Sequence, residues 1–379
     1  MLSEACRRTN ERCQGRDVLV LQDTTVLKSE GGGGDYLHAA IALDAQEDAI
    51  LGLVDGRFLS RQSGRKGQRR SLPIEEKESF RWLETADQAA SVCAGARRIT
   101  VISDREGDIY EAFALRPAEI ELLVRAAQDR SLGDDGQLFA VLDALSEADR
   151  ADLDLPAKPG QAARTARLAV RFTTIELARP KRDFREGLPA TLKMQLVDVR
   201  EIDPLPGTPE IHWRLLTTRT VENADQAWEI AKLYRRRWAI EQLFRTLKTN
   251  GFDIEGLRIE DPEPRDKLIM ATVIVAVSIQ QLVHARDGGP GPLRPAADAF
   301  DPEDLPLIEA YSAKLEGKTE RQKNPHPKGS LAFAAWVCAR LGGWTGYYGK
   351  PGPIVMLQGW LRLQNARHAI HTLGLSLNV

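Results

Sequence analysis

The chain has 379 residues, of which 42% are hydrophobic and 28% are charged. These proportions are ordinary for a globular protein of two or three domains and argue against a disordered or fibrous chain. The formal net charge of −2 gives no general attraction to nucleic acid, so a site for DNA or RNA would have to be a local basic patch. The four cysteines form no closely spaced metal-binding pairs, and we expect free thiols in a reducing cytosol.

The first third of the chain predicts a mixed sheet with helices. Strand patterns, each an apolar run bounded by turn-forming residues, occur at 18–23, 36–45, 49–60, 97–104 and 119–126. Helical patterns separate the last three of these strands, at 74–93 and 107–115. The order β-β-β-α-β-α-β predicts an α/β fold in which the first three strands are antiparallel neighbours.

The rest of the chain changes character twice. Residues 130–222 contain strand patterns separated by Pro and Gly, which predicts a β-rich insertion. The segment YRRRWAIEQLFRTLKTN, at 234–250, has no Gly or Pro and predicts one long helix. The apolar stretch at 268–279 is too short to span a bilayer and predicts a buried core helix, so we expect no membrane partner. Residues 305–372 predict mainly helices.

Three acidic residues are candidates for one site. Asp23 and Asp104 each end a predicted apolar strand, so adjacent strands could place both carboxylates at the same sheet edge. Glu241 lies on the predicted helix at 234–250 and reaches them if that helix packs along the sheet. Converging carboxylates repel one another unless a cation neutralises them, and hard oxygen ligands suit Mg²⁺ or Mn²⁺. Two such ions can activate a water and stabilise a leaving 3′ oxygen.

Each residue also has an ordinary structural interpretation. An Asp after a strand is commonly a turn or helix cap, and Glu241 could form an ion pair with Arg245 one turn later. The sequence RRRW could be a solvated basic turn. On one continuous helix, however, the side chains of Tyr234, Arg237, Glu241 and Lys248 would fall within roughly 60° of one another. Such a polar face favours contact with metal and phosphate over contact with water alone.

The spacing of these four residues resembles a known signature. Tyr234, Arg237, Glu241 and Lys248 match Y-x2-R-x3-E-x6-K, the YREK signature of bacterial DDE transposases of the insertion-sequence-four family, which includes the transposase of transposon five. The motifs LQDTT around Asp23 and ISDREGDIYE around Asp104 are similar to the first two acidic motifs of that family, and residues 336–364 are similar to its C-terminal helical region.

The resemblance implies a ribonuclease-H-like mixed sheet with a β-rich insertion and a C-terminal α-helical region. The implied divisions are a first part of the catalytic core, the β-rich insertion, a second part of the core with the Glu-bearing helix, and a C-terminal helical dimerisation region, at 1–129, 130–222, 223–286 and 287–379. The implied location is the bacterial cytoplasm, with nucleoid association when DNA is bound.

The implied activity is cut-and-paste transposition by metal-dependent phosphoryl transfer, through a 3′ nick, a hairpin, its resolution and strand transfer. The implied partners are double-stranded DNA, at transposon ends and target, and a second subunit in a homodimer. Asp23, Asp104 and Glu241 would hold Mg²⁺ or Mn²⁺. Arg237 and Lys248 would clamp phosphates, and Tyr234 would hydrogen-bond a phosphate near a flipped nucleotide.

Two further segments have candidate DNA contacts. In the family a Trp of the insertion stacks on the extruded base, and this role falls on Trp213, whose alternative is a core Trp in a strand. Trp238 is interpreted as a packing residue. The segment RQSGRKGQRRS, with Arg61, Arg65, Lys66, Arg69 and Arg70, could follow a phosphate backbone or be a solvated loop.

The sequence departs from the family pattern before Asp23, where 22 residues leave no room for the helical domain that recognises transposon ends. We therefore expect weak, salt-dependent binding without sequence preference. The alternative function is an N-terminally truncated inhibitor that forms heterodimers with a full-length transposase. A stand-alone metal-dependent nuclease is a third hypothesis, but it would leave the insertion and the C-terminal region unexplained.

Overall fold

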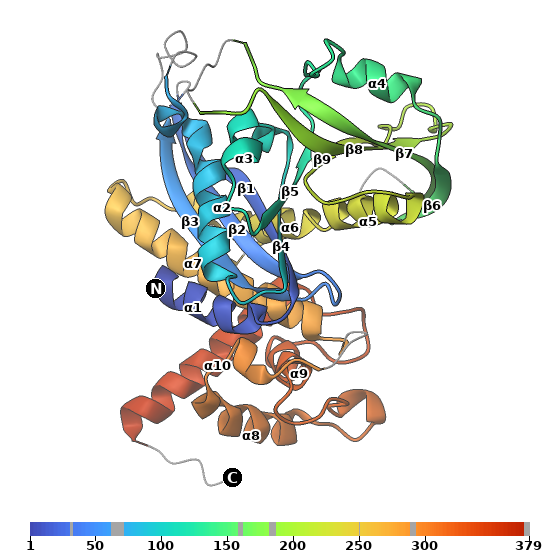
Figure 1. The fold of residues 1–379 in the computed structure, drawn as a ribbon. Coiled ribbons are helices and arrows are strands. Elements are labelled where there is room, and N and C mark those ends of the chain that lie inside the picture. Colours follow the sequence, from blue (N-terminus) through green and yellow to red (C-terminus); the bar gives the residue numbers. More distant parts are fainter. Residues whose placement is uncertain are drawn as a thin grey trace.

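The computed structural model describes residues 1–30, 33–61, 72–157, 162–181, 187–249, 251–288 and 293–374. Within these ranges the strands form one nine-stranded sheet of order β3-β2-β1-β4-β5-β9-β8-β7-β6 (Figure 1). The strands are β1 (Asp17–Glu30), β2 (Gly33–Asp44), β3 (Ile50–Arg61), β4 (Arg98–Ser103), β5 (Ile120–Arg125), β6 (Asp149–Leu155), β7 (Arg164–Ala178), β8 (Thr191–Glu201) and β9 (His212–Thr217).

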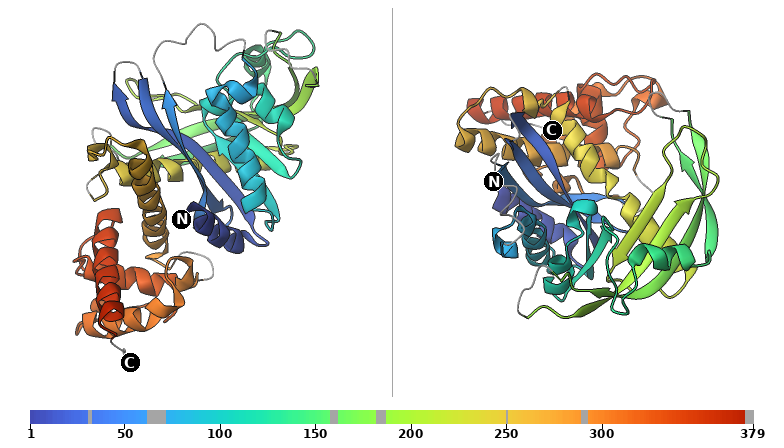
Figure 2. Two further views of the ribbon diagram at one scale, coloured as in Figure 1. Left: turned by 90° about the vertical axis from the view of Figure 1, so that its left-hand side faces the viewer. Right: turned by 90° about the horizontal axis from the view of Figure 1, so that it is seen from above.

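Helices cover both faces of the sheet, and a further group lies at one end of the molecule (Figures 1 and 2). The first seven are α1 (Leu2–Cys13), α2 (Arg81–Val92), α3 (Tyr110–Leu115), α4 (Leu138–Ala144), α5 (Ala224–Arg235), α6 (Trp238–Lys248) and α7 (Pro262–Ala285). Helices α2, α3 and α4, with the cysteines of α1, share one apolar cluster with the sheet, whereas α5, α6 and α7 share the other. The C-terminal helices are α8 (Leu305–Leu315), α9 (Leu331–Leu341) and α10 (Pro353–Leu373), and they enclose a third cluster with the end of α7.

Alternation along β1 explains how one strand serves both faces. Leu19 and Leu21 belong to the cluster under α5–α7, whereas Val18 and Val20 belong to the cluster under α2–α4. Successive side chains of a strand point to opposite faces, so a continuous apolar run is what a strand buried on both faces requires. As predicted, β1, β2 and β3 are antiparallel neighbours, and β4 and β5 follow β1 in parallel.

The β-rich segment continues the same sheet. Strand β9 pairs antiparallel with β5 over three residues, Leu123 to Arg125, and β8, β7 and β6 follow it in antiparallel order. The strands between 130 and 222 are therefore joined to the central strands through one short ladder, and α5 packs against β7 and β8. The residue limits of the predicted divisions remain a prediction.

The prediction of one helix over 234–250 is wrong. The segment is divided between α5, which ends at Arg235, and α6, which begins at Trp238. The backbone N–H groups of Arg236, Arg237, Ala239 and Ile240 each donate to the carbonyl three residues earlier, the tighter 3₁₀ pattern, so the α-helical pattern is interrupted there. The segment contains no Gly or Pro that would cause this interruption. We attribute it to packing, because α5 packs against β7 and β8 whereas α6 packs against β1.

The structure also adds one helix, moves the end of the first strand and lengthens the apolar helix. Residues 2–13 form α1, a helix that the sequence analysis did not predict. Asp23 lies inside β1, which continues to Glu30, and does not end the strand. The apolar stretch at 268–279 belongs to α7, a helix of 24 residues. By length and composition alone this helix could cross a membrane, but half of its most apolar part is buried in the protein. Its burial in the core fits the predicted core helix.

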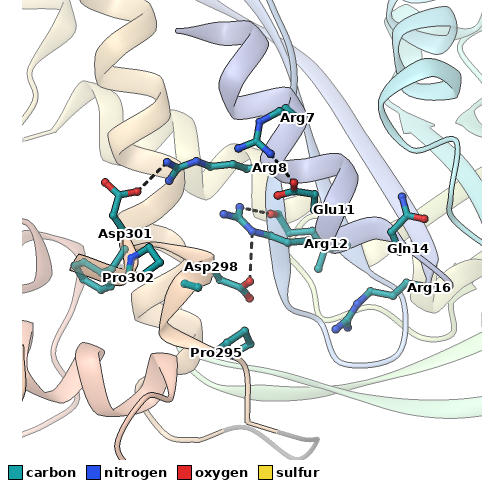
Figure 3. Close-up of a pocket in the computed structure, with 13 residues that line it drawn as sticks. Arg7, Arg8, Glu11, Arg12, Gln14, Arg16, Pro295, Asp298, Asp301 and Pro302 are labelled. Carbon is teal, nitrogen blue, oxygen red and sulfur yellow. Dashed lines mark hydrogen bonds and ion pairs between the residues drawn. The ribbon is translucent and has the colours of Figure 1, made fainter. Parts of the chain in front are cut away.

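Polar contacts hold the C-terminal region against α1 (Figure 3). Arg8 of α1 contacts Asp301 at 2.8 Å, and Arg12 contacts Asp298 at 3.4 Å, across a pocket of about 500 Å³. Arg367 of α10 also contacts Asp301, at 3.1 Å. Each of these acids lies opposite an arginine from a distant part of the chain, so we interpret the pocket as a structural junction.

Candidate active site beside the parallel strands

The register of the parallel strands places Asp23 beside Asp104. Leu21 of β1 pairs with Ile102 of β4, and continuing this register by two residues brings Asp23 level with Asp104, whose charge acts on Asp23. The regular pairing ends at this point, because β4 ends at Ser103 while β1 continues. Two carboxylates thus reach the same end of the parallel strands, where irregular backbone begins.

Strand alternation sends both carboxylates toward α6. Asp23 has the parity of Leu19 and Leu21, and Asp104 has the parity of Ile102, all of which belong to the cluster under α5–α7. Helix α6 packs against β1 on this face and carries Glu241 in its first turn. The three acids predicted from the sequence therefore converge on one side of the sheet, although on helix geometry different from that predicted.

Arg237 lies between two of these acids. Its Nη1 donates to Oδ2 of Asp23 at 2.8 Å, and its Nη2 donates to Oε1 of Glu241. The expected alternative partner of Glu241, Arg245, contacts the ring of Trp238 at 5.9 Å from the centroid. The guanidinium therefore joins the strand that carries Asp23 to the helix that carries Glu241.

The pKa of Asp23 is raised to about 6, and burial of its carboxylate is the largest cause of this shift. Arg237 and the backbone N–H of Thr24 oppose this shift, while the nearby charges of Asp104 and Glu241 add to it. A carboxylate with other carboxylates close by favours any cation that enters among them. Asp104 also caps the following turn, where its Oδ1 accepts from the N–H of Glu106 at 2.8 Å, so the capping interpretation and the site interpretation hold together.

Tyr234 and Trp213 form an aromatic wall beside the acids. Tyr234 is buried, its ring centroid is 5.9 Å from that of the half-buried Trp213, and the planes are tilted by 59°. Arg237 lies 6.0 Å from the Tyr234 centroid. Arg125, which was not predicted, follows the last β4–β5 pair, Ser103 with Val124, and donates to the backbone carbonyl of His212 at 2.7 Å. Its positive charge acts on Tyr234. Asp23, Asp104 and Arg125 thus form a row across three parallel strands.

Of the remaining predicted residues, the structure describes Lys248 and Trp238. Lys248, the last residue of α6, contacts Glu255 at 2.8 Å and is not joined to the three acids by any described ion pair. Trp238 is 43% exposed, and Arg245 lies over its ring at 5.9 Å from the centroid, so its interpretation as a packing residue remains a prediction. Of the basic segment at 61–71, residues 62–71 lie outside the described residues, as does the side chain of Arg61, and its role remains a prediction.

The opposite face of β1 carries a second polar group, which the sequence did not indicate. Thr24 Oγ1 lies 2.8 Å from Nδ1 of His38 and accepts from Nε of Arg81 at 3.2 Å. Arg81 also donates to Glu106 at 2.7 Å. Since Glu106 belongs to the turn that Asp104 caps, Arg81 ties the strand of Asp23 to the turn of Asp104 from behind.

The donor set fits a hard divalent cation. Carboxylate oxygens from Asp23, Asp104 and Glu241 are the ligands that Mg²⁺ and Mn²⁺ prefer. Within the described part of the chain no three acidic, His or Cys side chains are close enough to hold a metal ion as arranged, and the Arg237 guanidinium separates Asp23 from Glu241. The residue types suit the ion, and binding it among all three requires Arg237 to move.

A comparison with protein families identifies the domain to which most of the chain belongs. A family model described as a transposase DDE domain matches residues 49–277, which is 229 of the 379 residues. The match includes Asp104 and Glu241 and begins after Asp23. The mixed sheet with helices on both faces agrees with this domain, so the predicted ribonuclease-H-like α/β fold is confirmed.

Proposed function

The chain belongs to the transposase DDE domain family, and from this membership we propose that it moves DNA by a cut-and-paste reaction at Asp23, Asp104 and Glu241. Such a domain is an enzyme that cleaves DNA and transfers strands, so DNA is its substrate. We further propose that the chain is of the insertion-sequence-four type, with Tyr234 and Lys248 in its YREK signature. The observation that carries the proposal is the convergence of the two strand acids with Glu241 of α6.

The proposed cofactor is Mg²⁺ or Mn²⁺, held by Asp23, Asp104 and Glu241. When bound, a divalent ion supplies Lewis-acid activation of a water and charge stabilisation at a leaving 3′ oxygen. The side chains of the chain position these ligands: β1 and β4 fix the two Asp residues, and the packing of α6 on β1 fixes Glu241. The buried setting strengthens each interaction, because the surrounding dielectric is lower than that of water.

The cationic and aromatic residues are proposed to hold the DNA. Arg237 offers a planar fork for two phosphate oxygens, and Lys248 offers a point charge at the other end of α6. Tyr234 would donate its hydroxyl proton to a phosphate oxygen. Trp213 would stack on an extruded base, which is worth about 1–3 kcal/mol.

The proposed reaction is a series of in-line attacks at phosphorus. A water oxygen forms the first new P–O bond and the DNA 3′ oxygen leaves, taking up a proton as a 3′-OH. That hydroxyl attacks a phosphodiester of the opposite strand and closes a hairpin, while the 3′ oxygen of the flanking DNA leaves and takes up a proton. A second water then attacks the hairpin phosphodiester, and the 3′ oxygen of the transposon end leaves as a 3′-OH. The 3′-OH then attacks a target phosphodiester, and a target 3′ oxygen leaves.

Pairing of two subunits through residues 287–379 is a further proposal. In its support, α10 exposes apolar side chains, with Ile354 49% and Leu373 69% exposed. A second subunit in a homodimer, or a longer transposase in a heterodimer, would cover them. A location in the bacterial cytoplasm and nucleoid is part of the same proposal.

The test of the proposed function is strand cleavage. Purified protein is incubated with supercoiled plasmid and end-labelled duplex in EDTA, Mg²⁺ or Mn²⁺, and nicks and hairpins are resolved on denaturing gels. We expect cleavage with either ion, loss of cleavage in Glu241→Ala, and retained cleavage in Glu309→Gln, a change at an acid that contacts Lys328 in the C-terminal region. Cleavage in EDTA, or an active Glu241→Ala variant, would refute the assignment.

A further inference from the structure

Arg237 makes contacts that a phosphate clamp does not need. Its two terminal nitrogens bind the very oxygens that the proposed function assigns to a metal ion, one on Asp23 and one on Glu241. Only 17% of its side chain is exposed, so this guanidinium is enclosed by the site and does not extend from it. Its positive charge lies between the negative charges of Asp23 and Glu241.

A metal ion and this guanidinium compete for the same ligands. Arg237 already occupies one carboxylate oxygen of Asp23 and one of Glu241, so a divalent ion placed among the acids would compete with it for these carboxylates. Two cations a few ångströms apart in a partly buried site also repel one another strongly. Occupation by one therefore lowers the affinity for the other.

We propose that Arg237 is an internal counter-ion that the incoming divalent ion displaces, and that its displacement frees the guanidinium to bind a DNA phosphate. This inference rests on the proposed function of the three acids. It adds a coupling: the same side chain protects the acids from mutual repulsion before metal arrives and contacts DNA afterwards. Because coupling between ligands is reciprocal, metal and DNA then strengthen each other's binding.

Lys248 provides the contrast that makes the inference specific. It is the other proposed phosphate ligand of α6, and it is also ion-paired, with Glu255 at 2.8 Å. Glu255 is not one of the proposed metal ligands. Releasing Lys248 by Glu255→Gln therefore alters one phosphate ligand without altering the metal ligands, whereas Arg237→Gln alters both.

The experiment is a titration with Mn²⁺ alone, followed by electron paramagnetic resonance of the free ion, in the absence of DNA. It is carried out at about pH 8, where Asp23 is ionised. We expect Arg237→Gln to bind Mn²⁺ on the order of tenfold more tightly than the wild type, since a charge-assisted hydrogen bond no longer opposes the ion. Arg237→Lys, which keeps the positive charge but lacks the planar fork of the guanidinium, should be intermediate, and Glu255→Gln should equal the wild type.

The possible results distinguish the counter-ion role of Arg237 from the proposed metal-binding role of the acids. Equal or weaker Mn²⁺ binding by Arg237→Gln and Arg237→Lys, with binding still dependent on Glu241, would overturn the counter-ion inference and leave the proposed function standing. Wild-type Mn²⁺ binding that Glu241→Gln does not weaken would overturn both. Circular dichroism melts of each variant verify folding, and Arg237→Lys preserves the test where Arg237→Gln is unfolded.

A second measurement examines the released guanidinium. Fluorescence anisotropy of a labelled duplex is measured with and without Ca²⁺, a divalent ion that takes the same oxygen ligands. We expect Ca²⁺ to strengthen wild-type DNA binding several-fold more than binding by Arg237→Gln. An identical enhancement in both proteins would contradict the release of Arg237 toward phosphate.

Discussion

Strand β1 presents two contrasting polar surfaces at adjacent residues. Asp23 faces α6, where three acids gather around Arg237, whereas Thr24 faces α2, where His38 and Arg81 are its partners. Burial moves the titratable group on each face toward its neutral form, raising the pKa of Asp23 to about 6 and lowering the pKa of His38 to about 3.

The two faces differ in whether their charged groups are balanced by partners within the protein. Behind the strand, a neutral His38 and a paired Arg81 have their partners within the protein, so that surface is complete without a ligand. In front, acidic charge exceeds what Arg237 supplies to Asp23 and Glu241. The front is thus arranged for an added cation, and the back is arranged for rigidity. Substitutions on the two faces should separate loss of chemistry from loss of stability.

The largest effect is expected on the front face. Asp104→Asn should lower strand cleavage at least about a thousandfold, because a metal ligand contributes to several kcal/mol of transition-state stabilisation. Its thermal unfolding midpoint should stay close to that of the wild type. Asp152→Asn, at an acid 64% exposed on β6, is the matched control and should cleave normally. An active Asp104→Asn variant would remove Asp104 from the site.

The back face should show the opposite pattern. Arg81→Ala breaks the contacts of a buried side chain with Thr24 and Glu106, and we expect a loss of about 2–4 kcal/mol in the free energy of unfolding. Urea unfolding measures it. Arg150→Ala, which breaks an exposed pair with Glu147, should cost less than about 1 kcal/mol. Equal losses in the two variants would mean that Arg81 does not tie the strand to the turn.

A smaller effect depends on pH. The folded-state pKa of Asp23 is about 6, above its ordinary value of 3.8, so the wild type loses stability as pH rises from about 4 to about 6. Without metal, Asp23→Asn escapes this cost and should be more stable than the wild type by up to about 3 kcal/mol at pH 8. The advantage should vanish near pH 4. Thermal melts of both proteins in EDTA at several pH values measure this advantage. A stability difference between variant and wild type that does not change with pH would be inconsistent with a raised pKa of Asp23.

The smallest effect concerns the aromatic wall. Trp213→Ala should slow hairpin formation about tenfold and leave the first nick nearly unchanged, because only the hairpin needs an extruded base. Time courses on end-labelled duplex separate the two steps. Trp228→Ala, at a tryptophan of α5 that donates to Asp149, is the control. Equal slowing of both steps would indicate that Trp213 is a structural residue.

The sequence reveals the front face better than the back. Asp23 and Asp104 stand out because each follows an apolar strand pattern, and Glu241 stands out because it lies on a helical segment that also carries Tyr234, Arg237 and Lys248. The alternation that sends Asp23 toward α6 also follows from the sequence once the strands are paired. These features depend on local periodicity, which a sequence carries directly.

Other features depend on packing between distant segments. Arg125 enters the site only through the β4–β5 register, and Arg81 reaches Thr24 only because α2 lies across β1. The turn at Arg236 and Arg237 has good helix formers throughout, so local propensity does not reveal it. The ion pair between Arg237 and Asp23, 214 residues apart in the chain, is likewise a product of tertiary structure.

The central claim is that Asp23, Asp104 and Glu241 hold a divalent ion. Anomalous scattering from crystals soaked in Mn²⁺ locates such an ion directly. We predict a peak about 2–2.3 Å from carboxylate oxygens of these three residues, with the guanidinium of Arg237 withdrawn from Asp23 and Glu241. A peak elsewhere, or one that persists in crystals of Glu241→Gln with Arg237 still bridging Asp23, would contradict the claim.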